Sequence, residues 1–370
     1  MPILLSTFYF FYFAIIGVYI IFMPKVLAMS GYSASEIGII FAAGPLVRFM
    51  LPFAFVKGLK IDLKMFNTAL FITLLSALSF YFSLPSFYAL LCSSIGLGIG
   101  LSVVLPYIEV ISLSLIGKER YGKIRLFGSV GFVLVALVLV KFLSSPEIAL
   151  NYLFLATFFT VIAAFSIVMS AHVKNQKKEE VANDIDLLND WKLWLGLTLM
   201  QVSFGAFYNF FTIYETDFGV SLDMTIYLWS FGVLAEIVML FSQGRFLRNN
   251  LLSILQITTF ITALRWLLIY LFPQNIAVLF FAQSLHALSF ALFHSAAISY
   301  LFHTYKHKAL AQQFFSGITY GLGGFGGALL AGYIYEWFPR ELFLSAALLA
   351  LLAFVFLRLH ALNIKNQQLS

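Results

Sequence analysis

The stretch PYIEVISLSLIGKERYGKIRLFGSVGF, residues Pro106–Phe132, decides how the rest of the chain is interpreted. An apolar run that carries one carboxylate, Glu109, ends in a short charged turn, and the next apolar run opens with Lys123 and Arg125. Ionisable groups inside a membrane segment are costly, so they usually face a cavity and pair with one another. The stretch therefore predicts a hairpin of membrane helices that places an acid and a guanidinium at the floor of a solute-binding cavity.

The composition of the whole chain is typical of a membrane protein. Of 370 residues, 62% are hydrophobic and 10% are charged, the mean hydropathy is +0.96, and Phe alone contributes 43 residues. A soluble domain cannot bury that much apolar surface. The net charge of +6 comes mostly from basic residues at the ends of apolar runs, so we exclude nucleic acid as a partner. The single Cys92 excludes a disulfide framework.

Breaks in hydropathy divide the chain into about twelve apolar runs of the ~20 residues that a bilayer-spanning helix needs. The acids Glu215, Asp217 and Asp223 fall in a break on the side with few basic residues. The positive-inside rule places the more basic breaks, and both termini, in the cytoplasm. These basic breaks carry Lys60, Lys64, Lys118, Arg120, Lys174, Lys177, Lys178, Arg245, Arg248, Lys306 and Lys308.

We therefore expect an all-α polytopic membrane protein with twelve transmembrane helices in two six-helix halves, in the cell inner membrane. The halves are residues 1–173 and 191–370, and the charged stretch 174–190 is a cytoplasmic linker. That linker has two interpretations, a docking segment or a flexible tether, and its composition favours the tether.

An internal repeat supports the division into halves. Gly31-x-Ser33 matches Gly219-x-Ser221, and Gly44-x-Leu46-x-Arg48 matches Gly232-x-Leu234-x-Glu236. All pairs are 188 residues apart (219−31, 232−44 and 236−48). Two parallel repeats around a solute site are typical of the major facilitator architecture.

Five charged residues of the predicted spans are candidates for chemistry. Glu109 and Arg125 either bind the solute or have structural roles. In the structural interpretation, Arg125 extends from its helix end to the membrane surface and Glu109 binds a nearby hydroxyl. Glu236 is the only charge in its span, and Arg265 in the next span is the nearest partner by order. The pair is either structural or a titrating site whose carboxylate exchanges a proton during transport. Arg48 either lines the cavity or joins a network with Glu36 or Glu109.

His286 and His294 lie eight residues apart in one span, which places both imidazoles on roughly one helix face. Imidazole titrates near neutrality, so both are candidates for proton coupling. The sequence places no third metal ligand beside His286 and His294, so we expect no metal site here. The chain has no phosphate-binding motif and no nucleophile with a base, so we expect neither a cofactor nor an enzyme.

Several sequence motifs of this chain resemble those of known transporter families. The pattern P-Y-I-E…Y-G-K-I-R-L-F-G-S-V-G-F resembles the helix IV–V signature of the lactose permease branch of the major facilitator superfamily. The N-terminal YFFYFAIIGVYIIFMPKVLAMSGYSASEIGIIFAAGPLVRF, and LWSFGVLAEIV, ALRWLL and LHALSFALFHSAA in the second half, resemble the 3-phenylpropionic acid transporter family more closely.

The resemblance implies functions for particular residues. Substrate binding would involve Glu109, Arg125, Phe132 and Glu236, where Phe132 stands in place of a Trp that stacks on a sugar ring. The analogy also matches Arg265 and His286, and together with His294, which is taken from its spacing, the predicted proton-coupling residues are Glu236, Arg265, His286 and His294. Conformational change would involve the remnant of a cytoplasmic loop motif, Gly58-x-x-x-Asp62, and we add Arg48 to this set as a deep charge of the predicted spans.

Three departures from the permease pattern concern its proton site. Gln283 replaces a lysine, Ser289 replaces an acid, and Phe204 replaces the aspartate that pairs with that lysine. Losing both members of an ion pair is self-consistent, because one remaining charge is costly. The proton site is then Glu236 or a histidine, or there is none.

These observations predict a monomeric permease that moves a small organic solute together with a proton by alternating access. An aromatic or other carboxylic acid is the first substrate class, and a sugar or nucleoside is the alternative. An alternative of another class is a membrane sensor or assembly factor without flux. Measurable solute counterflow separates the two classes.

Overall fold

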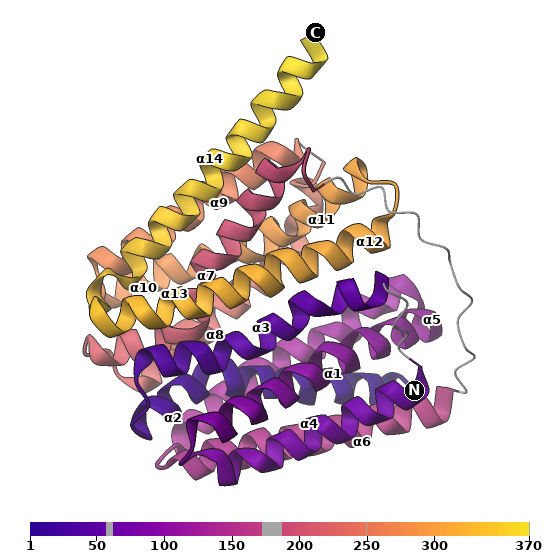
Figure 1. The fold of residues 1–370 in the computed structure, drawn as a ribbon, viewed down its shortest axis with the longest axis vertical. Helices are drawn as coiled ribbons and strands as arrows, with labels where there is room; N and C mark the ends of the chain where they lie inside the picture. The colour runs from indigo at the N-terminus through magenta and orange to yellow at the C-terminus, as the bar shows by residue number, and fades with distance from the viewer. Residues whose placement is uncertain (57–61, 172–186, 249, 370) are drawn as a thin grey trace. The chain divides into compact units, whose positions relative to one another are not determined.

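The computed structural model describes residues 1–56, 62–171, 187–248 and 250–369, and within them the regular structure is helical throughout (Figure 1). The helices are α1 (Pro2–Gly17), α2 (Met23–Met29), α3 (Ala34–Val56), α4 (Leu63–Ser83), α5 (Phe87–Phe142), α6 (Pro146–Ala171), α7 (Trp191–Asp217), α8 (Leu222–Ser242), α9 (Leu251–Leu271), α10 (Ile276–Ser284), α11 (Phe293–Thr304), α12 (Lys308–Phe314), α13 (Gly323–Trp337) and α14 (Leu342–Leu369).

Within the described residues, three membrane helices contain a π-helical segment, where the backbone widens by one residue per turn. These segments are η1 (Val18–Phe22) between α1 and α2, η3 (Ala287–Leu292) between α10 and α11, and η4 (Phe315–Leu322) between α12 and α13. Each therefore joins two labelled helices into one span. Such insertions often occur at functional sites.

Eleven segments of the described chain are long and apolar enough to cross a membrane, and α7 completes the twelve predicted helices. Two of the eleven, Phe87–Gly117 and Arg120–Phe142, are the parts of α5 on either side of Gly117, whose φ of 71° and ψ of 164° leave the helical region. The all-α membrane fold is thus confirmed.

The chain forms two compact units, Met1–Lys178 and Glu179–Ser370. Their boundary falls inside the predicted linker 174–190, most of which lies outside the described residues. In the first unit α1 packs against α5 and α6, and α4 packs against the same two helices. In the second unit α7 packs against α13 and α14, and α9 packs against α14.

The repeat in the sequence corresponds to a repeated turn in the structure. Gly31 and Gly219 have φ values of 91° and 94°, a left-handed conformation that glycine adopts without steric cost. Each glycine N–H donates to a carbonyl three residues back, and the following N–H donates to a carbonyl five residues back. The same helix end, with the same hydrogen bonds, therefore occurs 188 residues apart (219−31).

Candidate functional site

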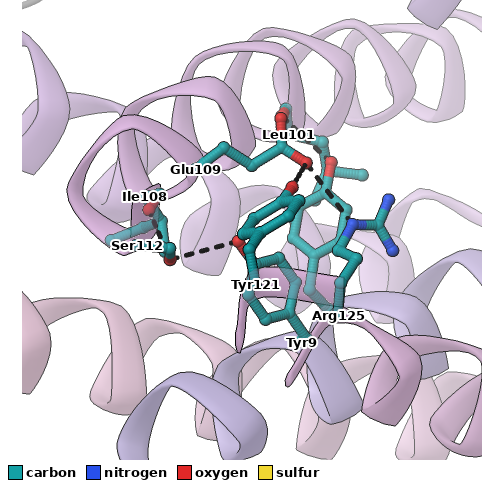
Figure 2. A network of polar contacts seen from close by, with 8 residues as sticks. Tyr9, Leu101, Ile108, Glu109, Ser112, Tyr121 and Arg125 are labelled. Atoms are coloured by element: carbon teal, nitrogen blue, oxygen red, sulfur yellow. Dashed lines mark hydrogen bonds and ion pairs between the residues drawn. The ribbon is translucent and has the colours of Figure 1, made fainter. Parts of the chain in front are cut away.

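In the first unit the two parts of α5 bring Glu109 and Arg125 into contact. Arg125 Nε lies 3.4 Å from Glu109 Oε1, and the two side chains are 32% and 31% exposed. The hydroxyl of Tyr121 donates to the same oxygen at 3.0 Å (Figure 2). Tyr121 and Arg125 are four residues apart, so they project from one helix face onto the carboxylate.

Helix α1 covers the guanidinium with aromatic rings. Arg125 Cζ lies 4.1 Å from the ring centre of Phe13 and 5.4 Å from that of Tyr9, within the range of cation–π attraction. A Cβ atom on Gly128 would lie 2.6 Å from Phe13, so glycine at this position makes room for the stack. The hydroxyl of Tyr9 is directed elsewhere, because it donates to Ser112 Oγ at 3.1 Å.

The guanidinium keeps an unused edge. Within the described chain, the hydrogen bond found for Arg125 uses Nε, and Figure 2 draws its two terminal amino groups pointing away from Glu109. A planar guanidinium with two adjacent N–H groups matches the geometry of a carboxylate or phosphate. This part of the first unit can therefore accept an anion beside aromatic rings.

The second unit contains a different cluster around Arg265, which is 0% exposed. Its Nη2 donates to Gln283 Oε1 at 2.8 Å, and its Nη1 contacts His286 Nδ1 at 3.0 Å and Ser289 Oγ at 3.1 Å. The guanidinium also lies 4.4 Å from the ring centre of Phe207. Two of the three polar partners, Gln283 and Ser289, are positions where the permease pattern has ionisable residues, so neutral acceptors here stabilise a buried cation.

These contacts fix the protonation of His286. An arginine has only donors, so His286 Nδ1 must be the acceptor, and the ring proton resides on Nε2. His286 Nε2 lies 3.7 Å from Glu236 Oε2, and the two side chains are 6% and 18% exposed. We predicted Arg265 as the partner of Glu236; the structure instead puts the neutral imidazole of His286 against Glu236 and joins Arg265 to the other side of the same ring.

His294 lies in the same column of rings as His286. Phe290 stacks on His286 at 5.3 Å between ring centres and on His294 at 6.3 Å. His294 Nδ1 also lies 2.7 Å from the hydroxyl of Tyr320, which belongs to the π-helical segment η4. The two histidines thus share one face, as predicted, with a phenyl ring between them.

The remaining predicted residues are placed apart from these clusters. Phe132 is half-buried, and its backbone lies against Gly17 of α1. Arg48 is exposed on α3, while Glu36, one of its two predicted partners, accepts from the Ser33 N–H at 2.9 Å and so caps its own helix. Asp62 caps α4 by accepting from the N–H of Met65 at 2.7 Å, and Gly58 lies outside the described residues.

Three residues of the Arg125 cluster escaped the sequence analysis, and one acid outside the clusters was misplaced by it. Tyr121 had a usable signal, its spacing of four from Arg125, whereas Tyr9 and Phe13 come from α1, far away in the sequence. Glu215 was predicted to lie in a polar break; it is instead in the last turn of α7 and 0% exposed. In the described residues no group of three or more His, Cys, Asp or Glu side chains is arranged to hold a metal ion.

Comparison with known proteins identifies the family. The family model described as the MFS_1 like family matches residues 3–345. The chain belongs to the MFS_1 like family. Members of this family are major facilitator transporters and not enzymes, so the protein is a multi-pass membrane protein that acts as a secondary transporter.

Two curated relatives and one solved structure illustrate its similarity to other members. A protein of Escherichia coli (strain K12) named "Probable 3-phenylpropionic acid transporter" is 25% identical over 372 residues, which cover 95% of each chain. The "Uncharacterized transporter YwbF" of Bacillus subtilis (strain 168) is 25% identical over 82% of this chain and 79% of its own. The crystal structure of nucleoside transporter NupG superposes with a TM-score of 0.79 at 16% identity, covering 96% of this chain and 98% of that one, and supports the fold alone.

Proposed function

We propose that the protein is a proton-coupled permease for small organic anions, with aryl carboxylates as its first substrate class. The observation that carries this proposal is Arg125, a third exposed, with Nε on Glu109 and its two terminal amino groups directed away from that acid. A substrate carboxylate can bind the unused edge through two parallel N–H···O bonds. Glu109 and Tyr121 then hold the guanidinium in place.

The aromatic surroundings favour a substrate with a ring. Phe13 and Tyr9 lie over Arg125, so a substrate carboxylate on the guanidinium leaves its aryl group near their faces. The name of the Escherichia coli relative, a probable 3-phenylpropionic acid transporter, supports the same substrate class. Phe132, which lies on α5 like Arg125 but apart from this cluster, stays in the proposal as a substrate contact because the family resemblance implies it.

The proton belongs to Glu236 in this proposal. Its carboxylate is 18% exposed and lies 3.7 Å from Nε2 of His286, so solution and a neutral imidazole are both within reach of the group that takes up the proton. His286 cannot accept a second proton while Arg265 donates to Nδ1, because two positive charges would then lie 3.0 Å apart. His286 and Arg265 therefore orient Glu236, and His294 extends the same ring column.

Replacing Arg125 tests the anion site. Arg125→Lys keeps the charge and removes the two-pronged geometry, which costs about 1.5–3 kcal/mol for a charged hydrogen bond, or roughly a 10- to 150-fold rise in half-saturation for 3-phenylpropionate. Lys123→Arg, a change of the same kind at an exposed position two residues earlier, should leave uptake unchanged. Uptake by Arg125→Lys equal to that of the wild type contradicts the proposal.

Proton movement tests the coupling. De-energised, lightly buffered cells that express the protein should alkalinise the medium when 3-phenylpropionate is added. Glu236→Gln should lower the alkalinisation per molecule of substrate taken up, whereas Asp223→Asn, at the other acid of α8, should keep it. If labelled substrate equilibrates in the wild type without alkalinisation, the protein is a uniporter and the proton assignment to Glu236 is wrong.

The alternatives have their own outcomes. Transport of sugars or nucleosides but of no acid would indicate that Glu109 and Glu236 accept hydroxyl hydrogen bonds. Absence of counterflow with every solute class would favour a sensor or assembly factor. The proposal also places a monomer in the cytoplasmic membrane with both termini and the tether 174–190 on the cytoplasmic side, which labelling of single cysteines introduced at these sites can test.

A further inference from the structure

A buried acid outside both clusters carries a further inference. Glu215 is 0% exposed, and neither of its carboxylate oxygens has a hydrogen-bond partner among the described residues. Its neighbour Tyr214 likewise has a buried hydroxyl without such a partner. An ionised carboxylate without hydrogen bonds is strongly disfavoured in such a place, whereas a carboxylic acid is tolerated.

In the part of the chain that the structure describes, no cationic side chain forms an ion pair with Glu215. Two residues further on, the exposed Asp217 accepts a hydrogen bond from Tyr335 of α13 at 2.8 Å, so this hydroxyl is committed to the other acid. Arg340, in the turn between α13 and α14, is itself exposed to solvent. The titratable and charged side chains at this end of the second unit are Tyr214 and Asp217 of α7, Asp223 of α8, Tyr270 of α9, Tyr335 and Glu336 of α13, and Arg340 and Glu341 of the turn.

The repeat shows that the fold does not require an acid at this position. The carbonyl of Glu215 accepts from the N–H of Val220 in the helix-ending turn, and in the first unit the carbonyl of Leu27 accepts from the N–H of Tyr32 in the equivalent turn. Glu215 and Leu27 are 188 residues apart (215−27), and both are 0% exposed. One copy of the turn therefore buries leucine where the other copy buries glutamate.

We propose that Glu215 is a second proton-binding site, distinct from Glu236, which holds a proton while this end of the second unit is closed and exchanges it with solution during transport. Its position in the last turn of α7 places it two residues before the solvent-exposed Asp217 and four before the exposed Gly219, so a small opening of α7 from α13 hydrates the carboxyl group. Only the exchange during transport rests on the proposed function. The presence of the bound proton does not.

Infrared spectra of the purified protein in liposomes test the bound proton without any substrate. At neutral pH the carbonyl band of protonated carboxylic acids should be larger in the wild type than in Glu215→Gln by the contribution of one acid. Glu215→Leu, which copies the residue of the first repeat, should lose the same intensity and melt at a temperature close to that of the wild type. Asp217→Asn, the exposed acid of the same turn, should keep the band. Equal bands in the wild type and both Glu215 variants overturn the proposal.

Transport by the same variants tests the exchange. Glu215→Gln and Glu215→Leu should retain exchange of labelled 3-phenylpropionate across the membrane. The number of protons removed from the medium for each substrate molecule that enters should fall to half of the wild-type value or less. Alkalinisation at the wild-type ratio in both variants overturns the exchange of this proton. If the wild type moves no aryl acid at all, the proposed function fails, while the infrared comparison still decides whether Glu215 binds a proton.

Discussion

The buried guanidinium of Arg265 makes a quantitative prediction for substitutions of Gln283. Arg265 is 0% exposed, and Gln283 Oε1 accepts from its Nη2 at 2.8 Å. The other end of the same side chain, Gln283 Nε2, is buried without a partner among the described residues. Three substitutions of similar length then separate the contributions of hydrogen bonding and charge.

Gln283→Met removes one hydrogen bond from a buried charge, which costs about 1.5–3 kcal/mol. For a unit of this size, that lowers the melting temperature by roughly 3–12 °C. Gln283→Lys adds a like charge at ~4 Å, worth about 4 kcal/mol of further repulsion at an effective dielectric constant of ~20. Gln283→Glu supplies a countercharge and removes the unpartnered N–H donors, so it should melt at or above the wild type.

Thermal unfolding followed by intrinsic Trp fluorescence measures this order, because Trp266 lies 4.4 Å from the Arg265 guanidinium. The exposed Gln312 is a control, and Gln312→Met should not change the melting temperature. A lysine variant of Gln283 that melts as high as the glutamate variant would refute a buried cation at Arg265. It would also remove the argument that His286 carries its proton on Nε2.

Three further predictions concern packing, the repeat and the anion site. Gly327→Ala should destabilise the protein by about 1–3 kcal/mol, because the new Cβ would lie 2.8 Å from a backbone carbonyl of α7, whereas Gly326→Ala, with 3.9 Å to its nearest neighbour, should melt as the wild type does. Gly31→Ala and Gly219→Ala, at φ of 91° and 94° with no atom within 4 Å, should each cost about 1 kcal/mol, and clearly unequal losses in unfolding experiments would contradict the equivalence of the two turns. Tyr121→Phe should raise the half-saturation for 3-phenylpropionate in counterflow roughly 2- to 10-fold by removing one hydroxyl from the anion site, and an unchanged value would show that this hydroxyl does not position the guanidinium.

The membrane fold could be predicted from the sequence because hydropathy and glycine placement act locally. Gly31 and Gly219 marked the turns that follow two helices, and the structure gives both a positive φ. The π-helical segments were not predicted, because one additional residue in a helical turn leaves no trace in an apolar sequence. Glu215 was misplaced for a related reason, since a lone acid next to a helix end is ordinarily exposed and only three-dimensional packing buries it.

The candidate sites could be predicted only in part. Glu109 and Arg125 were identified because charges are rare in membrane helices and a short turn brings their two helices together. Phe13 was not, because aromatic residues are abundant in this sequence and nothing local distinguishes the one that lies over Arg125. For Arg265 a charged partner was expected, but the two terminal nitrogens of the buried guanidinium contact neutral oxygens and an imidazole, which charge counting cannot reveal.

The two repeats use one backbone position for different purposes, which explains how similar units can carry different chemistry. In the first unit a Cβ atom on Gly98 would lie 2.7 Å from Gly44 Cα, so the two helices touch through backbone alone. In the second unit the repeat of Gly44 is Gly232, whose added Cβ would lie 3.2 Å from Gln283 Oε1 and 3.7 Å from His286 Cβ. The space that closes a helix contact in the first unit thus holds the polar partners of Arg265 in the second. The proposal puts an anion site in one unit and a proton site in the other. Side-chain substitutions on a common backbone are enough for this, because each unit has to accommodate only one of the two sets of side chains.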